Sequence, residues 1–163
     1  MDNYIVINGK KAELTNEQLE KLGIKVENDI FQQGEDVEYF YISESGEVYR
    51  DTDMGCSCDI NRFKAANYCT DKSVMEQRAL RETLNRLLWR YSMRHDGDKI
   101  NWSNRDGRWF RIFYSHVSDE LRIEKNDAYH DICAVYFYTK EIAEAAIEEI
   151  VKPFMKEHPE FVW

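Results

Sequence analysis

The sequence predicts an α+β fold in which antiparallel strands and hairpins pack with one long central helix and a C-terminal helix. Short alternating segments separated by turn residues, such as Asn-Gly at 8–9 and SESG at 43–46, predict hairpins. A leucine stripe at helical spacing between residues 71 and 94 predicts the long helix. With 163 residues, of which 43% are hydrophobic, the chain is expected to form one domain over 1–163.

The first part of the chain is predicted to contain two hairpins and a short helix. The hairpin strands are expected at residues 4–7 with 10–14 and at 38–42 with 47–50. Thr15 and Gln18 have the spacing of a capping box, which would start a helix at 16–22. The stretch 51–61, DTDMGCSCDIN, is rich in polar and small residues and is predicted to be a loop.

The long helix is predicted from Asp71 to about Arg94, with two different faces. Its core face carries Leu80, Leu84, Leu87, Leu88 and Tyr91. Its opposite face carries Arg78, Glu82, Arg86, Trp89 and Met93.

The last part of the chain is predicted to be an antiparallel meander followed by a helix. The strands are expected at 108–117, 120–124 and 132–138. Thr139 is expected to cap the C-terminal helix, and Pro153 to kink or end it because proline lacks a backbone N–H. Its inward residues are expected to be Ile142, Ala146, Ile150 and Phe154.

Two strand-to-helix junctions share one pattern. NYCTDK at 67–72 and VYFYTK at 135–140 each end an aromatic strand with a threonine and a lysine before a helix. A threonine at this place accepts a hydrogen bond from an unpaired helix N–H, which contributes about 1 kcal/mol. We attribute both junctions to this need, with Thr70 and Thr139 as caps, and leave an internal duplication as the alternative.

The net charge of −9 argues against general binding to nucleic acid, since phosphate contacts require clustered Lys and Arg. The charge is unevenly distributed. Residues 1–60 carry 5 basic and 14 acidic side chains, 61–116 carry 12 and 6, and 117–163 carry 5 and 11. The sequence has neither the pattern of a signal peptide nor an apolar run of roughly 20 residues. We therefore expect a cytoplasmic protein without membrane contact, whose four cysteines are reduced thiols.

Candidate chemistry for catalysis or metal binding is sparse. Cys56, Cys58 and Cys69 are weak zinc candidates, because their spacing departs from the usual C-x₂₋₄-C pairs and no fourth ligand lies nearby. Asp127, His130 and Asp131 could serve a small metal-dependent enzyme. No hydrolase, nucleotide-binding or metalloprotease motif is present. We therefore expect neither an enzyme nor a cofactor.

A binding surface is predicted in the basic middle of the chain. Its candidate residues are Arg86, Trp89, Arg90 and Met93 on the long helix, with Arg108 and Trp109 after it. Trp and Arg together are typical of protein-binding hot spots and also of platforms for single-stranded nucleic acid. The alternative is that another element covers Trp89. Glu141, Glu144 and Glu148 form an acidic helix face, which could imitate phosphates or be simply solvated.

Several segments resemble small accessory proteins of prophages in Gram-positive gut bacteria. These are YIVINGKKAELTNEQLEKLGI, EYFYISESGEVY, GDKINWSNRDGRWF and the terminal YFYTKEIAEAAIEEI. The resemblance implies an anti-defence role in the cytoplasm of the host bacterium, including inhibition of CRISPR nucleases. It transfers no catalytic residue.

The leading hypothesis is therefore an anti-CRISPR protein that binds a basic type II CRISPR nuclease without catalysis, its acidic flanks speeding the encounter. The second is a phage accessory protein that binds single-stranded nucleic acid. The oligomeric state stays open.

Overall fold

The computed structural model describes residues 4–7, 10–15, 18, 21–22, 29–101, 103, 108–126 and 131–163. The predicted helix at 16–22 lies largely outside these residues. Its capping box is present, because the Thr15 N–H donates to Gln18 Oε1 at 2.9 Å and the Gln18 N–H donates to Thr15 Oγ1 at 3.3 Å. The first hairpin is also confirmed, with β1 (Tyr4–Ile7) antiparallel to β2 (Lys10–Glu13).

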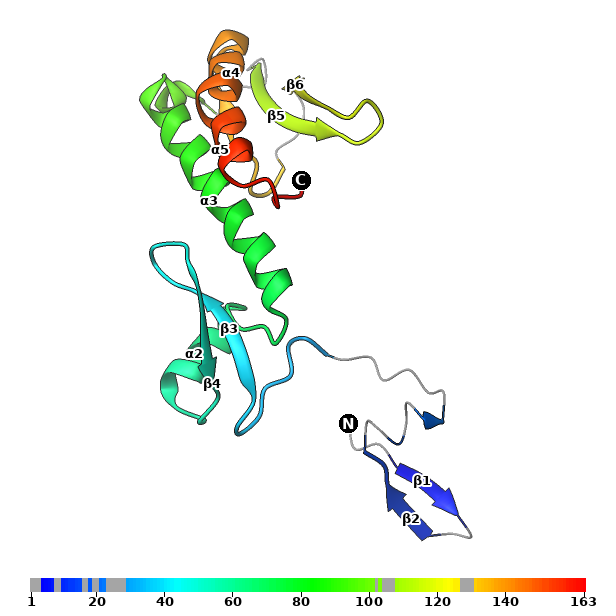
Figure 1. Ribbon diagram of the computed structural model, residues 1–163. Coiled ribbons are helices and arrows are strands. Elements are labelled where there is room, and N and C mark those ends of the chain that lie inside the picture. The colour runs from blue at the N-terminus through cyan, green and yellow to red at the C-terminus, as the bar shows by residue number, and fades with distance from the viewer. Residues whose placement is uncertain are drawn as a thin grey trace.

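The fold is α+β, as predicted, and is organised around the long helix α3 (Lys72–Arg94). Figure 1 shows that α3 runs from one group of elements to another. The first unit contains β3 (Glu38–Ile42), β4 (Val48–Thr52) and α2 (Ser57–Lys64). The second unit contains β5 (Trp109–Ser115), β6 (Glu120–Asn126), β7 (Tyr136–Phe137), α4 (Lys140–Ala146), the π-helical η2 (Ile147–Val151) and α5 (Lys152–Glu157). A short 3₁₀ turn, η1 (Gly97–Lys99), follows α3.

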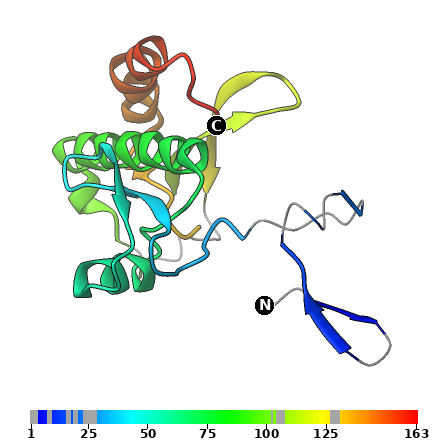
Figure 2. The same ribbon diagram turned by 60° about the horizontal axis from the view of Figure 1, so that its bottom comes forward.

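Helix α3 contributes to two separate cores. The predicted leucine stripe is confirmed, since Leu84, Leu88 and Tyr91 are buried with the helix α4–α5 and strand β7 in the second core. Met75 and Ala79 lie on the other side of α3 and pack with β3 in the first core. Figure 2 shows the β3–β4 hairpin alongside α3. The helix therefore joins the two units by burying opposite faces at its two ends.

The two units share one strand arrangement. In the first, β3 pairs with β4 and also bridges to Cys69, just before α3. In the second, β5 pairs with β6 and with β7, just before α4. Tyr68 and Cys69 thus correspond to Tyr136 and Phe137, which shows that the junctions share a topology as well as a helix start.

This arrangement corrects two expectations. The strands of the second unit do not form a meander, because β7 pairs with β5 and the order is β6-β5-β7. Thr70 does not cap α3, because its hydroxyl donates to the Ile30 carbonyl oxygen at 3.2 Å. Asp71 is the cap instead, accepting from the backbone N–H groups of Ser73 and Val74. Thr139 caps α4 as predicted.

Two further boundaries differ from the prediction. The stretch 51–61 is not a loop, because β4 continues to Thr52 and α2 begins at Ser57. Pro153 does not end the C-terminal helix, which continues to Glu157, so that part of the prediction is wrong. The α-helical hydrogen-bond pattern gives way to a π-helical segment, Ile147–Val151, directly before the turn that contains Pro153, where the proline lacks an N–H to donate. No helix among the described residues has the length and apolar character needed to cross a bilayer.

Gly46, in the turn between β3 and β4, lies against α3. Its φ is +93°, and an added Cβ would lie 2.9 Å from Thr83 Oγ1 and 3.4 Å from Arg86 Nη2. We expect Gly46→Ala to lower the free energy of unfolding by about 1–2 kcal/mol through backbone strain and this contact. Urea denaturation would measure the loss. Gly34→Ala is the control, because its φ is not positive and its added Cβ would meet only Val37 Cγ2 at 3.4 Å. An equal loss in both variants would contradict the explanation.

Candidate functional site

An exposed apolar and basic surface lies on the C-terminal half of α3. We call Arg86, Trp89, Arg90 and Met93 the Trp89 surface. The side chain of Trp89 is 60% exposed and that of Met93 is 41% exposed, and both arginines are exposed. Because Met93 follows Trp89 by four positions and Arg86 precedes it by three, these side chains are neighbours on the helix. The interpretation that another element covers Trp89 is therefore wrong.

A groove lies beside Trp89, between α3 and the segment that leads into β7. Its volume is about 500 Å³, and it is lined by Glu82, Asn85, Arg86, Trp89 and residues 133–135. Asn85 fixes the opposite wall, since its Nδ2 donates to the Cys133 carbonyl oxygen at 3.0 Å. The volume falls within the range of ligand pockets, about 300–1,000 Å³. The groove is thus large enough to accept a side chain of a partner.

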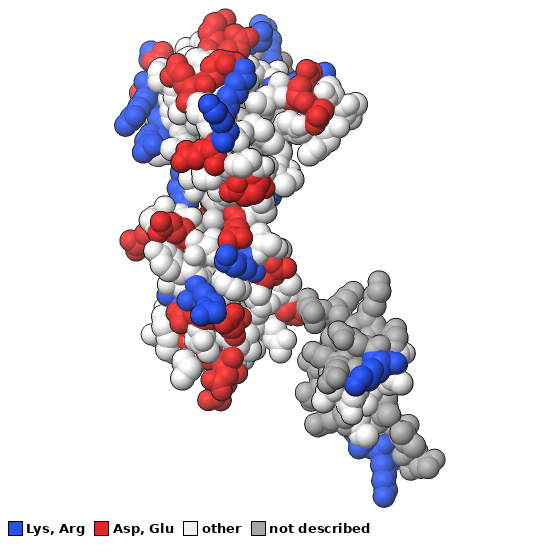
Figure 3. Space-filling view, viewed as in Figure 1, with Lys and Arg blue, Asp and Glu red and all other residues white. Residues whose placement is uncertain are grey.

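Three arginines follow one another on successive turns of α3 at this surface. Arg86, Arg90 and Arg94 are spaced by four residues, which is about 6 Å along the helix axis. None of the three forms an ion pair within the described part of the chain, whereas Arg78, two turns earlier, pairs with Glu82 at 2.7 Å. Figure 3 shows acidic and basic side chains interspersed over the face that it displays, with basic ones gathered at the edge near the C-terminal end of α3. The end of α3 therefore carries unpaired positive charge.

The two residues predicted to extend this surface behave differently. Arg108 is exposed just before β5. Trp109 is only 9% exposed, and its ring lies 5.9 Å from the ring of Tyr138. Trp109 therefore offers no open ring face, which its predicted role in binding would need. Strand periodicity could not reveal this, because the pairing of β5 with both β6 and β7 decides what covers the strand.

The acidic residues of the C-terminal helix are exposed as predicted, but two of them are paired. Glu144 pairs with Lys140 at 2.9 Å, and Glu148 pairs with Lys152 at 2.5 Å. Hydrogen bonds from the backbone and from Thr139 lower the pKa of Glu141 below its ordinary value. Because lysines neutralise two of the three carboxylates, this face is a poorer mimic of a phosphate array than the sequence indicated.

The cysteines do not form the predicted set of ligands. Cys56 and Cys58 form a disulfide, so the expectation of four reduced thiols is wrong. Cys56 caps α2 and Cys58 lies in its first turn, which brings the two side chains together. Cys69 is buried, and its Sγ accepts from the Asp71 N–H at 3.4 Å. Among the described residues, the side chain that joins the pair within 4.8 Å is Asp59, not Cys69.

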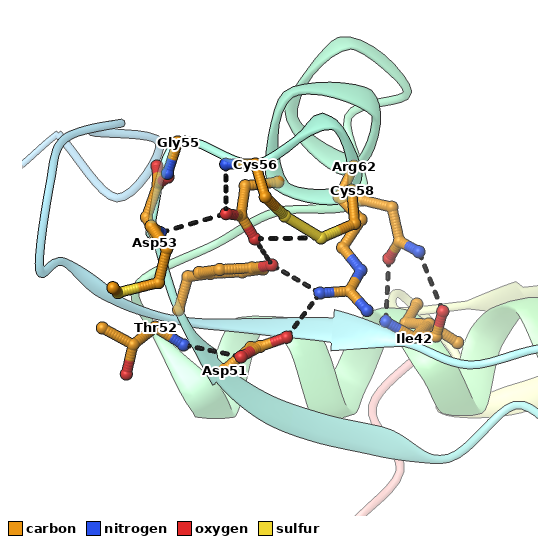
Figure 4. Close-up of polar contacts among 12 residues, drawn as sticks. Ile42, Asp51, Thr52, Asp53, Gly55, Cys56, Cys58 and Arg62 are labelled. Atoms are coloured by element: carbon orange, nitrogen blue, oxygen red, sulfur yellow. Dashed lines mark hydrogen bonds and ion pairs between the residues drawn. A yellow bond between two sulfur atoms is a disulfide. The ribbon is translucent and has the colours of Figure 1, made fainter.

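A buried polar network lies next to this disulfide and was not predicted. Asp59 is 1% exposed and accepts hydrogen bonds from the Tyr39 hydroxyl at 2.7 Å and from the N–H groups of Met54 and Cys56 at 3.0 and 3.1 Å. Figure 4 shows these contacts with Arg62, which reaches both the Tyr39 hydroxyl and Asp51. The carboxylate of Asp59 thus has a donor at each oxygen.

A second buried carboxylate completes the network. Asp53 is 2% exposed and accepts from the Gly55 N–H at 2.9 Å and from the Tyr68 hydroxyl at 3.1 Å. The Tyr68 ring stacks on the Tyr39 ring at 4.0 Å. Burial and the neighbouring carboxylates raise the pKa of Tyr39 to about 12 and raise that of Tyr68. Since these groups already have partners, we assign the network to holding α2 on the β3–β4 hairpin.

Acidification should weaken this network. The hydrogen bond from Tyr39 holds the pKa of Asp59 below its ordinary value. Its contribution to stability is complete above the aspartate pKa of about 4 in the unfolded chain and is lost as pH falls through the lower folded-state value. We expect thermal stability to fall below about pH 4, and to fall less steeply in Asp59→Asn, which cannot titrate. Calorimetry across pH 2–5 would check this, and parallel slopes in the two proteins would contradict it.

Only one of the three residues considered for a metal-dependent enzyme is among the described residues. Asp127 and His130 lie outside them, and Asp131 forms an ion pair with Arg111. His95 follows the end of α3, where its ring stacks on Tyr91 at 4.1 Å and its Nδ1 lies 2.8 Å from the Tyr91 carbonyl oxygen. The Trp89 surface is therefore the best-defined candidate site.

Comparison with known proteins adds no assignment: no family model, no curated protein and no solved structure matches the chain. The resemblance to prophage accessory proteins stays a prediction.

Proposed function

We propose that this protein acts without catalysis, by binding a protein partner through the Trp89 surface. The observation that carries the proposal is the exposure of Trp89 beside a groove and among arginines that lack ion pairs within the described residues. Exposing most of a tryptophan side chain leaves a large apolar area in water, which association would bury. Trp and Arg are the residues most enriched where partners gain binding energy. A protein interface therefore accounts for the features of this surface.

The resemblance described above suggests the partner, a bacterial defence effector and most concretely a type II CRISPR nuclease. The ion pairs of Glu144 with Lys140 and of Glu148 with Lys152 affect which surface would bind such a nuclease. Because lysines already pair Glu144 and Glu148, the acidic face of α4 offers a nuclease little free negative charge, whereas the end of α3 offers the exposed indole of Trp89. We therefore place the interface on α3, and assign the acidic flanks no direct contact.

The alternative of a single-stranded nucleic-acid-binding protein is less well supported. That hypothesis needs successive aromatic rings on which bases can stack. Because Trp109 is buried, Trp89 lacks the second exposed tryptophan ring that was predicted for base stacking. A net charge of −9 also repels a polyanion at long range.

Inhibition of DNA cleavage tests the proposed function. Purified protein in excess would be incubated with several guide-loaded type II nucleases before target DNA is added. We expect cleavage by at least one of them to be abolished, with the protein left intact and no DNA or RNA degraded. Undiminished cleavage by every nuclease would refute this choice of partner.

A further inference from the structure

The arrangement of charge and apolar area at the end of α3 specifies more than a protein interface. This further inference rests on the proposed function and concerns the chemistry of the partner segment that binds the same surface. Three features have to be matched by one occupant: an exposed indole, a groove of about 500 Å³ beside it and a row of arginines without ion pairs in the described part of the chain.

The exposed face of α3 begins where the cover of the first unit ends. The β3–β4 turn approaches α3 closely, because a Cβ added at Gly46 would lie 2.9 Å from Thr83 Oγ1 and 3.4 Å from Arg86 Nη2. Met75 and Ala79, further toward the N-terminus of α3, are covered by the first unit. Trp89 and Met93 continue the same side of the helix by helical spacing but are left exposed. An occupant of the Trp89 surface would therefore extend the cover that the hairpin provides over the first half of α3.

The arginine row gives this surface a positive charge. Arg86, Arg90 and Arg94 have no carboxylate partner among the described residues, although the protein as a whole is strongly acidic. Several other surface arginines have carboxylate partners: Arg50 pairs with Glu38 at 3.2 Å, and Arg122 pairs with Glu120 at 2.7 Å. Arg81 and Arg108 form no ion pair among the described residues, but neither belongs to the row on α3. Guanidinium groups bind carboxylates through two parallel hydrogen bonds. Unpaired arginines within an acidic protein thus favour carboxylates supplied by another molecule.

We propose that the Trp89 surface is a docking site for an acidic segment of the partner that carries one large apolar side chain. The apolar side chain enters the groove between Trp89 and residues 133–135. Carboxylates on either side of it lie against the arginine row, whose spacing of about 6 Å along α3 suits acidic residues on alternate positions of an extended segment. A short acidic segment fits better than a nucleic acid for two reasons. The surface offers a single exposed indole, whereas a nucleic acid needs successive rings for its bases. The net charge of −9 also repels a long polyanion more strongly than a short acidic segment.

Fluorescence anisotropy with defined probes tests this proposal on the full chain. The probe is a short labelled peptide of alternating glutamate and serine with a central phenylalanine. Its matched partner has glutamine in place of every glutamate, and labelled oligo-deoxythymidine is the third probe. We expect the glutamate peptide to bind at least about tenfold more tightly than either of the others, and its affinity to fall with added salt.

Variants locate the binding on α3. We expect Trp89→Ala to weaken glutamate-peptide binding by more than about tenfold and Arg90→Gln by about three- to tenfold. Arg50→Gln removes an exposed arginine on β4 and is expected to leave binding unchanged. The bound peptide should also slow alkylation of Cys133, whose exposed thiol lies beside the groove, whereas Cys69 is buried. Equal affinity for the glutamate and glutamine peptides, or no effect of Arg90→Gln, would overturn the proposal.

The outcomes separate this inference from the choice of partner. Tighter binding of oligo-deoxythymidine would assign the surface to nucleic acid and refute the acidic segment. Inhibition of a nuclease that depends on Trp89, with no binding of the glutamate peptide, would refute the acidic segment and leave the protein interface standing. Peptide binding that depends on Arg90, without inhibition of any nuclease, would keep the docking site and reject the nuclease.

Discussion

Phe137→Ala is expected to lower the free energy of unfolding by about 3–5 kcal/mol, the range for removing a buried phenylalanine ring. Phe137 is 0% exposed and lies in the second core with Leu84 and Leu88 of α3. Its backbone pairs with Phe110 of β5, so the cavity would open between the sheet and α3. Because the second core also holds the leucine stripe, the loss should destabilise the end of α3 that carries the Trp89 surface.

Urea denaturation followed by circular dichroism would measure this loss. Phe31→Ala is the matched control, because the Phe31 side chain is 47% exposed and belongs to neither core. We expect the control to lose less than about 1 kcal/mol. A loss below about 1 kcal/mol in Phe137→Ala would show that the second core is not built around this ring.

Trp89→Ala is expected to have the opposite profile, with a large effect on function and a small one on stability. The side chain is 60% exposed and belongs to neither core, so the midpoint of thermal unfolding should stay nearly constant. Loss of the indole removes the largest apolar group of the surface and one wall of the groove. Hot-spot tryptophans cost at least about 2 kcal/mol when truncated, which is a roughly 30-fold loss of affinity.

Trp109→Ala is the matched control, since it deletes the same side chain from a buried position. Trp109 is 9% exposed in β5, so we expect this variant to lose stability by about 3 kcal/mol or more. At temperatures where it stays folded, its affinity for a partner should be close to that of the parent protein. A stability loss in Trp89→Ala comparable to that in Trp109→Ala would mean that Trp89 is structural.

Local signals in the sequence were sufficient for much of the fold. The leucine stripe placed α3 nearly to its ends, because the periodicity of a long amphipathic helix is strong. Turn residues at 8–9 and 43–46 located both hairpins. The exposed side of α3 was also correct, because helical spacing alone groups Arg86, Trp89, Arg90 and Met93 away from the leucine stripe.

The features that could not be predicted depend on partners distant in sequence. Helix α2 lies in a polar stretch, and Asp59 becomes informative only when Tyr39, twenty positions earlier, is seen to donate to it. The order β6-β5-β7 arises because the strand just before α4 pairs with the first strand of its unit rather than with its neighbour in sequence. Trp89 and Trp109 look equivalent in the sequence, and only the pairing and packing of β5 distinguish the buried ring from the exposed one.

The spacing of the acidic residues in the sequence was misleading for a related reason. Glu144 and Glu148 have lysines four positions away, and the structure pairs them across one helical turn. On α3, Glu82 lies four positions from both Arg78 and Arg86, and it forms its ion pair with Arg78. The unpaired charge that matters for binding is therefore positive, although the net charge is negative.

The measurement that tests the central claim most directly is a titration of nuclease inhibition by the parent protein and by Trp89→Ala. The nuclease would be one whose cleavage the parent protein abolishes, and the unfolding midpoint of both proteins would be recorded in the same buffer. We predict that Trp89→Ala needs at least about tenfold more protein for half-inhibition while its unfolding midpoint is unchanged. Equal inhibition by the two proteins would contradict the assignment of function to the Trp89 surface.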